Sequence, residues 1–144
     1  RQKLSSEGKS AFVITDHYGL ASEFTFYSPE ARQPSHKVPQ IFPVETAEPR
    51  NQFYFWPEYA YSKNRRGENA VFVQQLTTAP LEKGWPLRWL LKKPVQGAWD
   101  FVPETPPASL TNAFESVKDL GVVVIPLTGR MARGIQLFEC RNLR

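Results

Sequence analysis

The stretch from Phe12 to Pro29 limits the possible folds most strongly, because its hydrophobic period changes part-way along. Ala11 to Thr15 is apolar and β-branched, too short for a helix and of the right length for a buried strand. After Gly19 the apolar residues take a helical spacing and form one stripe: Leu20, Ala21, Phe24 and Tyr27. Pro29 ends the helix, because proline disfavours helical geometry at the residue before it. The sequence therefore predicts a strand–turn–helix unit.

Further strands are predicted downstream. Gln40 to Val44 is short and bounded by prolines, which favours a peripheral place in the sheet. Asn69 to Gln75 carries the apolar run of a sheet interior. Gly121 to Leu127 and Gly134 to Cys140 flank a polar turn, Thr128 to Arg133, and a pair this close must be antiparallel. The predicted fold is α/β: a mixed sheet that opens with a strand–helix unit, has flanking helices and ends in a C-terminal antiparallel hairpin.

The segment between the second and third strands is rich in aromatic residues, which are Phe53, Tyr54, Phe55, Trp56, Tyr59 and Tyr61. Pro57 suits the first turn of a short helix that runs towards Lys63. Gly67 suits a left-handed turn that follows this helix.

The length of 144 residues predicts one domain with a substantial core. Residues 1–10 are polar and are expected to be a linker. Residues 76–112 hold six prolines and three of the four tryptophans, and we interpret them as an insertion. Its centre places tryptophans beside a basic end: Trp85, Trp89, Lys92 and Lys93. This centre is either an interfacial membrane anchor or a short element packed on the core with solvated lysines.

The net charge of +4 and the pI near 9.3 do not point to nucleic acid, because the basic residues are scattered and match no nucleic-acid-binding motif. We expect this charge to give a weak attraction to anionic lipid head groups instead. Cys140 is the only cysteine, which excludes an internal disulfide and favours a small buried residue. His17 and His36 lack metal-ligand spacing, so we expect no metal and no cofactor.

Polar and aromatic residues follow the first two strands, where open α/β sheets bind ligands. The candidate binding residues are Asp16, His17, Tyr18, Glu23, Asn51, Gln52 and Trp56. A carboxylate, amide groups and an indole ring together suit a carbohydrate, since the polar atoms bind hydroxyls and the ring stacks on a sugar face. The alternatives are that Asp16 only caps the helix and that Trp56 only fills the core. No catalytic motif is recognisable.

Four stretches carry a resemblance to a known family. They are Asp16 to Pro29, Asn51 to Trp56, Gly67 to Val73, and the pair Phe114–Val117 and Phe138–Arg141 near the end. Together they resemble the soluble C-terminal region of bacterial membrane glycosyltransferases related to dolichyl-phosphate-mannose protein mannosyltransferases and to the aminoarabinose transferase of lipid A. His17 and the tryptophan-rich insertion depart from that pattern.

The resemblance implies a periplasmic accessory domain attached to the transmembrane portion of the same polypeptide. In that family the donor is a polyprenyl-phosphate-linked sugar, and catalysis belongs to acidic residues in loops of the transmembrane part, so no catalytic residue is expected here. The domain would position the acceptor, contact a glycan or lipid-linked sugar, or brace the membrane portion. The alternatives are a free-standing α/β module that binds a glycan or small molecule, and a hydrolase in which Asp16, His17 and Glu23 meet a nucleophile.

Overall fold

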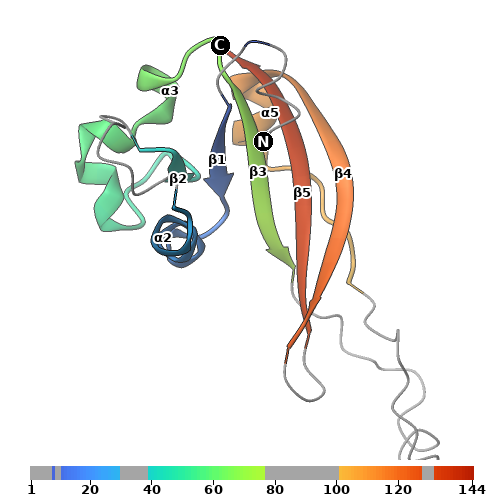
Figure 1. The fold of residues 1–144 in the computed structure, drawn as a ribbon. Helices are drawn as coiled ribbons and strands as arrows, with labels where there is room; N and C mark the ends of the chain where they lie inside the picture. The colour runs from blue at the N-terminus through green and yellow to red at the C-terminus, as the bar shows by residue number, and fades with distance from the viewer. Residues whose placement is uncertain (1–7, 9–10, 30–38, 77–100, 128–131) are drawn as a thin grey trace, which may run out of the picture.

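The described residues form a mixed sheet of five strands in the order β2-β1-β3-β5-β4, with helices around it (Figure 1). The computed structural model describes residues 8, 11–29, 39–76, 101–127 and 132–144. The strands are β1 (Ala11–Thr15), β2 (Ile41–Pro43), β3 (Asn69–Leu76), β4 (Phe114–Pro126) and β5 (Ala132–Leu143). The helices are α2 (Tyr18–Tyr27), η2 (Gln52–Phe55), η3 (Pro57–Tyr59), α3 (Tyr61–Asn64) and α5 (Ala108–Ala113). The predicted α/β class is confirmed.

The parallel half of the sheet consists of β2, β1 and β3. Val13 of β1 lies opposite Ile41 of β2 on one side and opposite Val71 of β3 on the other, and both pairings are parallel. The strand β2 has three residues and stands at the edge of the sheet, as its flanking prolines predicted. The first strand–helix unit is therefore the centre of this half.

The antiparallel half is a ribbon of β4 and β5, which joins the parallel half through the antiparallel β3–β5 pair. The terminal hairpin is confirmed, but its first strand begins at Phe114 instead of Gly121. Polar residues such as Glu115 and Lys118 hid this extension, because an edge strand is less buried and tolerates charge. Ala132 and Arg133 belong to β5 and not to the predicted turn, whose residues 128–131 lie outside the described part.

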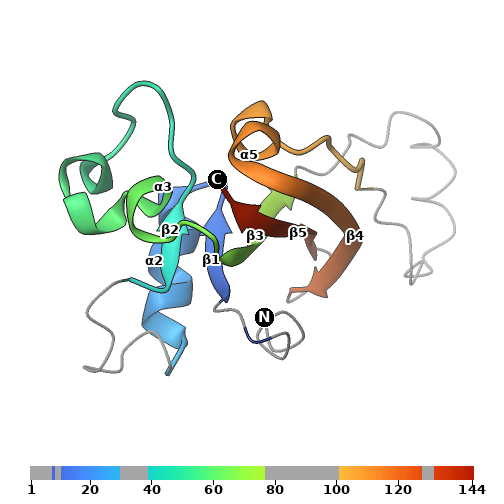
Figure 2. The ribbon, with the colours of Figure 1, turned by 90° about the horizontal axis from the view of Figure 1, so that it is seen from above.

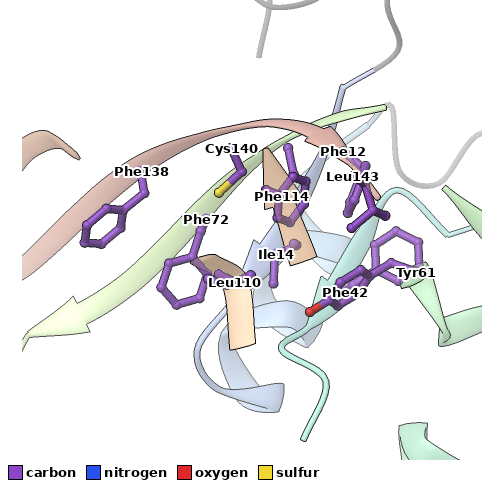
Figure 3. Packing of buried hydrophobic residues seen from close by; sticks show 11 residues of the cluster. Phe12, Ile14, Phe42, Tyr61, Phe72, Leu110, Phe114, Phe138, Cys140 and Leu143 are labelled. Atoms are coloured by element: carbon purple, nitrogen blue, oxygen red, sulfur yellow. The ribbon is translucent and has the colours of Figure 1, made fainter. Parts of the chain in front are cut away.

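The two faces of the sheet are covered by different elements (Figure 2). On one face, Tyr61 of α3 and Leu110 of α5 join a cluster of buried aromatic and apolar side chains (Figure 3). The strand members of this cluster are Phe12, Ile14, Phe42, Ala70, Phe72, Phe114, Phe138, Cys140 and Leu143. On the other face, Leu20 of α2 packs on Val73 and Ile135. The alternation of side chains along each strand thus produces two separate cores.

The helix α2 uses only part of its predicted stripe. Leu20 and Ala21 are buried, and Phe24 packs on the smaller core, as expected. Tyr27 is 76% exposed, so its predicted burial is wrong. It lies in the last turn, beyond the part of α2 that meets the core, and its ring packs edge-on against Phe26.

Arg65 and Cys140 are both buried, and Arg65 contacts the parallel half of the sheet. The Arg65 guanidinium donates to the Pro39 carbonyl at 2.6 Å and to Glu68 at 3.1 Å, and it lies 5.8 Å from the ring centres of Phe12 and Phe42. Burial raises the pKa of the Cys140 thiol to about 12, so this cysteine is a buried neutral group, as predicted. Gly67, with φ of 77°, takes the predicted left-handed conformation.

The described end of the predicted insertion packs on the sheet. Leu76 is the last residue of β3, and Leu110 of α5 is fully buried. Glu104 accepts from Gln74 of β3 at 2.6 Å, and its backbone N–H donates to Gln136 of β5 at 2.8 Å. Trp85, Trp89, Lys92 and Lys93, as well as residues 1–7 and 9–10, lie outside the described residues. The short helix predicted from Pro57 is divided into η3 and α3.

Candidate functional site

A shallow hollow lies at the carboxyl end of β2. It is lined by Pro43, Val44, Glu45, Thr46, Asn51, Phe53, Tyr54 and Tyr59. Val44 donates its backbone N–H to the carbonyl of Thr15 at 2.8 Å, so the hollow begins where β1 and β2 end side by side. This is the edge of an open α/β sheet at which ligands bind. The hollow therefore occupies the expected place, and Asn51 is the predicted residue that lines it.

The polar side of the hollow is held by hydrogen bonds between side chains and backbone N–H groups. The Asn51 side chain accepts from the backbone N–H of Phe53 at 3.0 Å and caps η2. The Glu45 carboxylate accepts from the backbone N–H of Ser62 at 2.9 Å, while its own N–H donates to the Tyr61 hydroxyl at 3.3 Å. These bonds fix one carboxylate and one amide in place while leaving each with further hydrogen-bonding capacity.

The aromatic side of the hollow is packed ring against ring. Phe53 lies 4.7 Å from Tyr59 between ring centres, and Tyr59 lies 6.2 Å from the fully buried Phe42. Burial, and the nearby Glu58 carboxylate, raise the pKa of Tyr59, so its hydroxyl stays protonated at neutral pH and can donate a hydrogen bond. Tyr54 is 54% exposed and offers a ring to solvent beside the hollow.

The chemistry of the hollow suits a small polyhydroxylated ligand. The Glu45 carboxylate and the Asn51 amide can bind hydroxyl groups, and the rings of Tyr54 and Tyr59 give flat apolar surfaces. The hollow is shallow and open, with a cavity volume of about 30 Å³. That is far below the roughly 300–1,000 Å³ of pockets that enclose small molecules, so a sugar ring would lie against the hollow and would not be enclosed by it.

Asp16 lies at the same edge, but its carboxylate turns towards β3. Its Oδ2 accepts from the backbone N–H of Gln75 at 2.7 Å, while its Oδ1 is buried with no hydrogen-bond partner in the described part of the chain. Burial raises the pKa of Asp16, although the bond from Gln75 and the neighbouring His17 oppose that shift. Asp16 thus joins two parallel strands beyond their last pair, Thr15 and Val73.

The interpretation of Asp16 as the helix cap is wrong, because His17 holds that position. The His17 backbone is extended, and its Nδ1 accepts from the N–H of Gly19 at 3.0 Å. The ring of Tyr18 packs on the His17 ring at 4.4 Å. An extended residue just before the first turn is the one whose side chain reaches the free N–H groups, and Asp16 is one residue too early.

The remaining predicted residues are spread over the surface. Glu23 of α2 pairs with Arg133 of β5 at 3.4 Å. Gln52 begins η2 and is exposed. Trp56 is 42% exposed and meets Phe53 edge-on at 5.3 Å, so its interpretation as a core residue is wrong. Asp16, His17 and Glu23 each bond to a different partner, an arrangement that gives no support to a shared hydrolytic centre.

Seven lining residues were missed by sequence reasoning: Pro43, Val44, Glu45, Thr46, Phe53, Tyr54 and Tyr59. Glu45 follows the second strand as closely as Asp16 follows the first, so its position was a usable signal. The tyrosines gave no such signal, since their sequence neighbour Tyr61 belongs to the core.

Within the described residues, no group of three or more His, Cys, Asp or Glu side chains could hold a metal ion. Over the same residues, no helix has the length and apolarity needed to cross a membrane. No protein family model, curated protein or solved structure matches the chain.

Proposed function

We propose that this chain is the periplasmic C-terminal accessory domain of a membrane-embedded glycosyltransferase that uses a polyprenyl-phosphate-linked sugar donor. Its role is to position the acceptor, and it does not catalyse sugar transfer alone. The observation that carries this proposal is the hollow beside β2, which combines the Glu45 carboxylate, the Asn51 amide and two tyrosine rings. Those groups bind hydroxyls and stack on sugar faces.

The resemblance to that family of transferases supports the same proposal, because two of its four stretches meet in one buried cluster. The first supplies α2 and the second supplies η2. The third and fourth supply Phe72, Phe114, Phe138 and Cys140, which are all buried in one cluster. The third and fourth stretches thus share one core, whereas Leu20 of the first stretch packs in the smaller core and the η2 of the second has no buried residue.

Two experiments test the proposal. The first is to determine the coding sequence upstream of Arg1, which is expected to encode several hydrophobic spans. A start codon or signal peptide immediately before Arg1 would instead favour the alternative, a free-standing module that uses the hollow to bind a glycan or small molecule. The second is an assay of sugar transfer, in which the purified 144-residue chain is expected to be inactive.

The role of the hollow is tested in the full-length enzyme by Tyr54→Ala. The matched control is Phe55→Ala, since Phe55 is 72% exposed and does not line the hollow. Loss of one stacking ring is expected to raise the KM for the acceptor about tenfold, with kcat nearly unchanged. An equal effect of both substitutions, or of neither, would remove the hollow from acceptor binding.

A further inference from the structure

The outer strand β4 leaves a large apolar surface uncovered. From residue 120 to residue 127 no side chain is charged. Five large apolar side chains of this run are 42% to 50% exposed: Leu120, Val123, Val124, Ile125 and Leu127. Exposed apolar side chains that cluster in this way mark interaction surfaces. We name these five side chains the β4 surface.

The β4 surface faces both sides of the sheet. Val123 lies opposite Ile135, whose side chain packs in the core under α2. Val124 lies opposite Gly134, where an added Cβ would meet the ring of Phe101 on the other side of the sheet. Neighbouring residues of a strand point to opposite faces. A protein partner with one flat face would therefore cover only half of the exposed side chains.

The free edge of β4 is poorly suited to pairing with another strand. A bulge interrupts the register between Asp119 and Gly121, and Pro126 has no backbone N–H to donate. Bulges and prolines are the features by which edge strands avoid pairing with other chains. Only Val122 to Ile125 remain between them, which is a short segment for a stable β–β contact between two copies.

Basic residues flank the uncharged run. Lys118 precedes it on β4 and is exposed, and Arg133 lies opposite Ile125 on β5. Carboxylates lie beside them as well: Asp119 accepts from Gly121 at 2.7 Å and from Gln136 at 2.8 Å, and Glu139 lies opposite Lys118. The pair of Arg133 with Glu23 is exposed, so it contributes little and can exchange for another anion. The attraction to an anionic surface therefore comes from the net charge of +4 of the whole chain, and the exposed apolar run complements the apolar layer beneath the head groups.

We propose that the β4 surface binds a lipid bilayer that contains anionic head groups, with Val123, Val124 and Ile125 at head-group depth. A bilayer interface contacts both faces of a ribbon at once, and water at that depth still solvates the free backbone groups of the edge. The β4 surface shares no residue with the hollow, so this proposal can fail without the proposed function and can hold without it.

The test is co-sedimentation of the 144-residue chain with vesicles of phosphatidylcholine and phosphatidylglycerol in equal parts. We expect binding that weakens at least tenfold with vesicles of phosphatidylcholine alone, because the cations then lose their partners. The double variant Val123→Asp with Ile125→Asp is expected to lose binding about tenfold or more. The matched control is Val102→Asp, since Val102 is 61% exposed but lies outside β4, and this variant is expected to bind like the wild type.

A second readout keeps the proposal testable if the double variant folds poorly. Cys140 is the only native thiol and is fully buried, so Ile125→Cys provides one accessible site for an environment-sensitive dye. A blue shift of the dye on addition of the same vesicles supports the proposal, and an unchanged spectrum overturns it. Absence of sedimentation of the wild-type chain would also overturn it. The proposal would also be overturned if light scattering showed a dimer of the wild-type chain, and if the double variant were monomeric but still bound vesicles. That result would assign the β4 surface to contact with a second copy of the chain.

Discussion

The parallel half of the sheet and the β4–β5 ribbon are built from similar residues but are covered very differently. Phe12 in β1 is fully buried between neighbouring strands and packs on Tyr61. Val123 in β4 has one neighbouring strand and is 49% exposed. A run of branched apolar residues thus becomes a core where helices cover both faces, and a surface where they do not. Both halves contribute to the larger core, since Phe114 and Phe138 of the ribbon are fully buried, but the outer strand of the ribbon also leaves large apolar side chains exposed.

The largest expected effect is at the seam between the two halves. Phe72 of β3 is fully buried, and its ring lies 5.8 Å from that of Phe138 in β5. Phe72→Ala removes this contact and leaves a cavity, which is expected to lower the free energy of unfolding by about 4 kcal/mol. Urea unfolding measures the loss. Phe55→Ala on the exposed η2 is the control and is expected to change stability by less than about 0.5 kcal/mol.

A smaller effect is expected where the described end of the insertion packs on the ribbon. An added Cβ at Gly134 would lie 2.3 Å from the ring of Phe101. Gly134→Ala is therefore expected to destabilise the protein by about 2 kcal/mol through overpacking. If the clash is the cause, Phe101→Ala in the same chain recovers part of that loss, as a double-mutant cycle would show. Purely additive effects would instead place the strain elsewhere in the ribbon.

Local patterns predicted the parallel half well, because its elements depend on neighbours in sequence. The β1–α2 unit was recognisable from the change of period at Gly19, and β2 from its flanking prolines. The ribbon was predicted as a hairpin but not at its full length, since the early residues of β4 are polar as edge strands allow.

The candidate site was harder to predict, because its contacts join residues far apart in the chain. Asp16 bonds to Gln75, 59 positions later, and only the β1–β3 register brings them together. Glu45 and Tyr59 meet at the hollow because α3 folds back onto the core, where the buried Tyr61 hydroxyl accepts from the Glu45 N–H. Asn51 was predicted because it lies soon after a strand. The others depend on tertiary packing that no short window of sequence contains.

Removing the hydrogen bond from Gln75 to Asp16 tests how much a single carboxylate stabilises the parallel half. Asp16→Ala removes the acceptor and is expected to cost about 1.5 kcal/mol at neutral pH, measured by urea unfolding. Asp16→Asn keeps an acceptor oxygen and is the matched control. A loss as large in Asp16→Asn as in Asp16→Ala would contradict a hydrogen-bonding role.

We also expect the stability difference between the wild type and Asp16→Asn to depend on pH. The pKa of Asp16 is raised by burial, so the folded state binds its proton more tightly than the unfolded state does. The resulting stabilisation is fully present below the ordinary value of 3.8 and is lost as the pH rises through the raised pKa of the folded state. The wild type is therefore expected to lose stability relative to Asp16→Asn over that interval, in melting curves recorded from pH 3 to pH 7. A constant difference would mean that the carboxylate is solvated.

The smallest effect is expected at the start of α2, where His17 caps the helix. His17→Ala leaves the N–H of Gly19 without its acceptor and is expected to cost about 1 kcal/mol, whereas His17→Asn retains a capping side chain and should lose much less. Thermal unfolding distinguishes the two. Because α2 covers only the core of Leu20, Val73 and Ile135, local opening measured by hydrogen exchange should increase in α2 and leave the ribbon amides of β4 unchanged. Increased exchange in both regions would mean that the two halves unfold as one unit. The two halves would then differ only in the exposure of their apolar side chains and not in local stability.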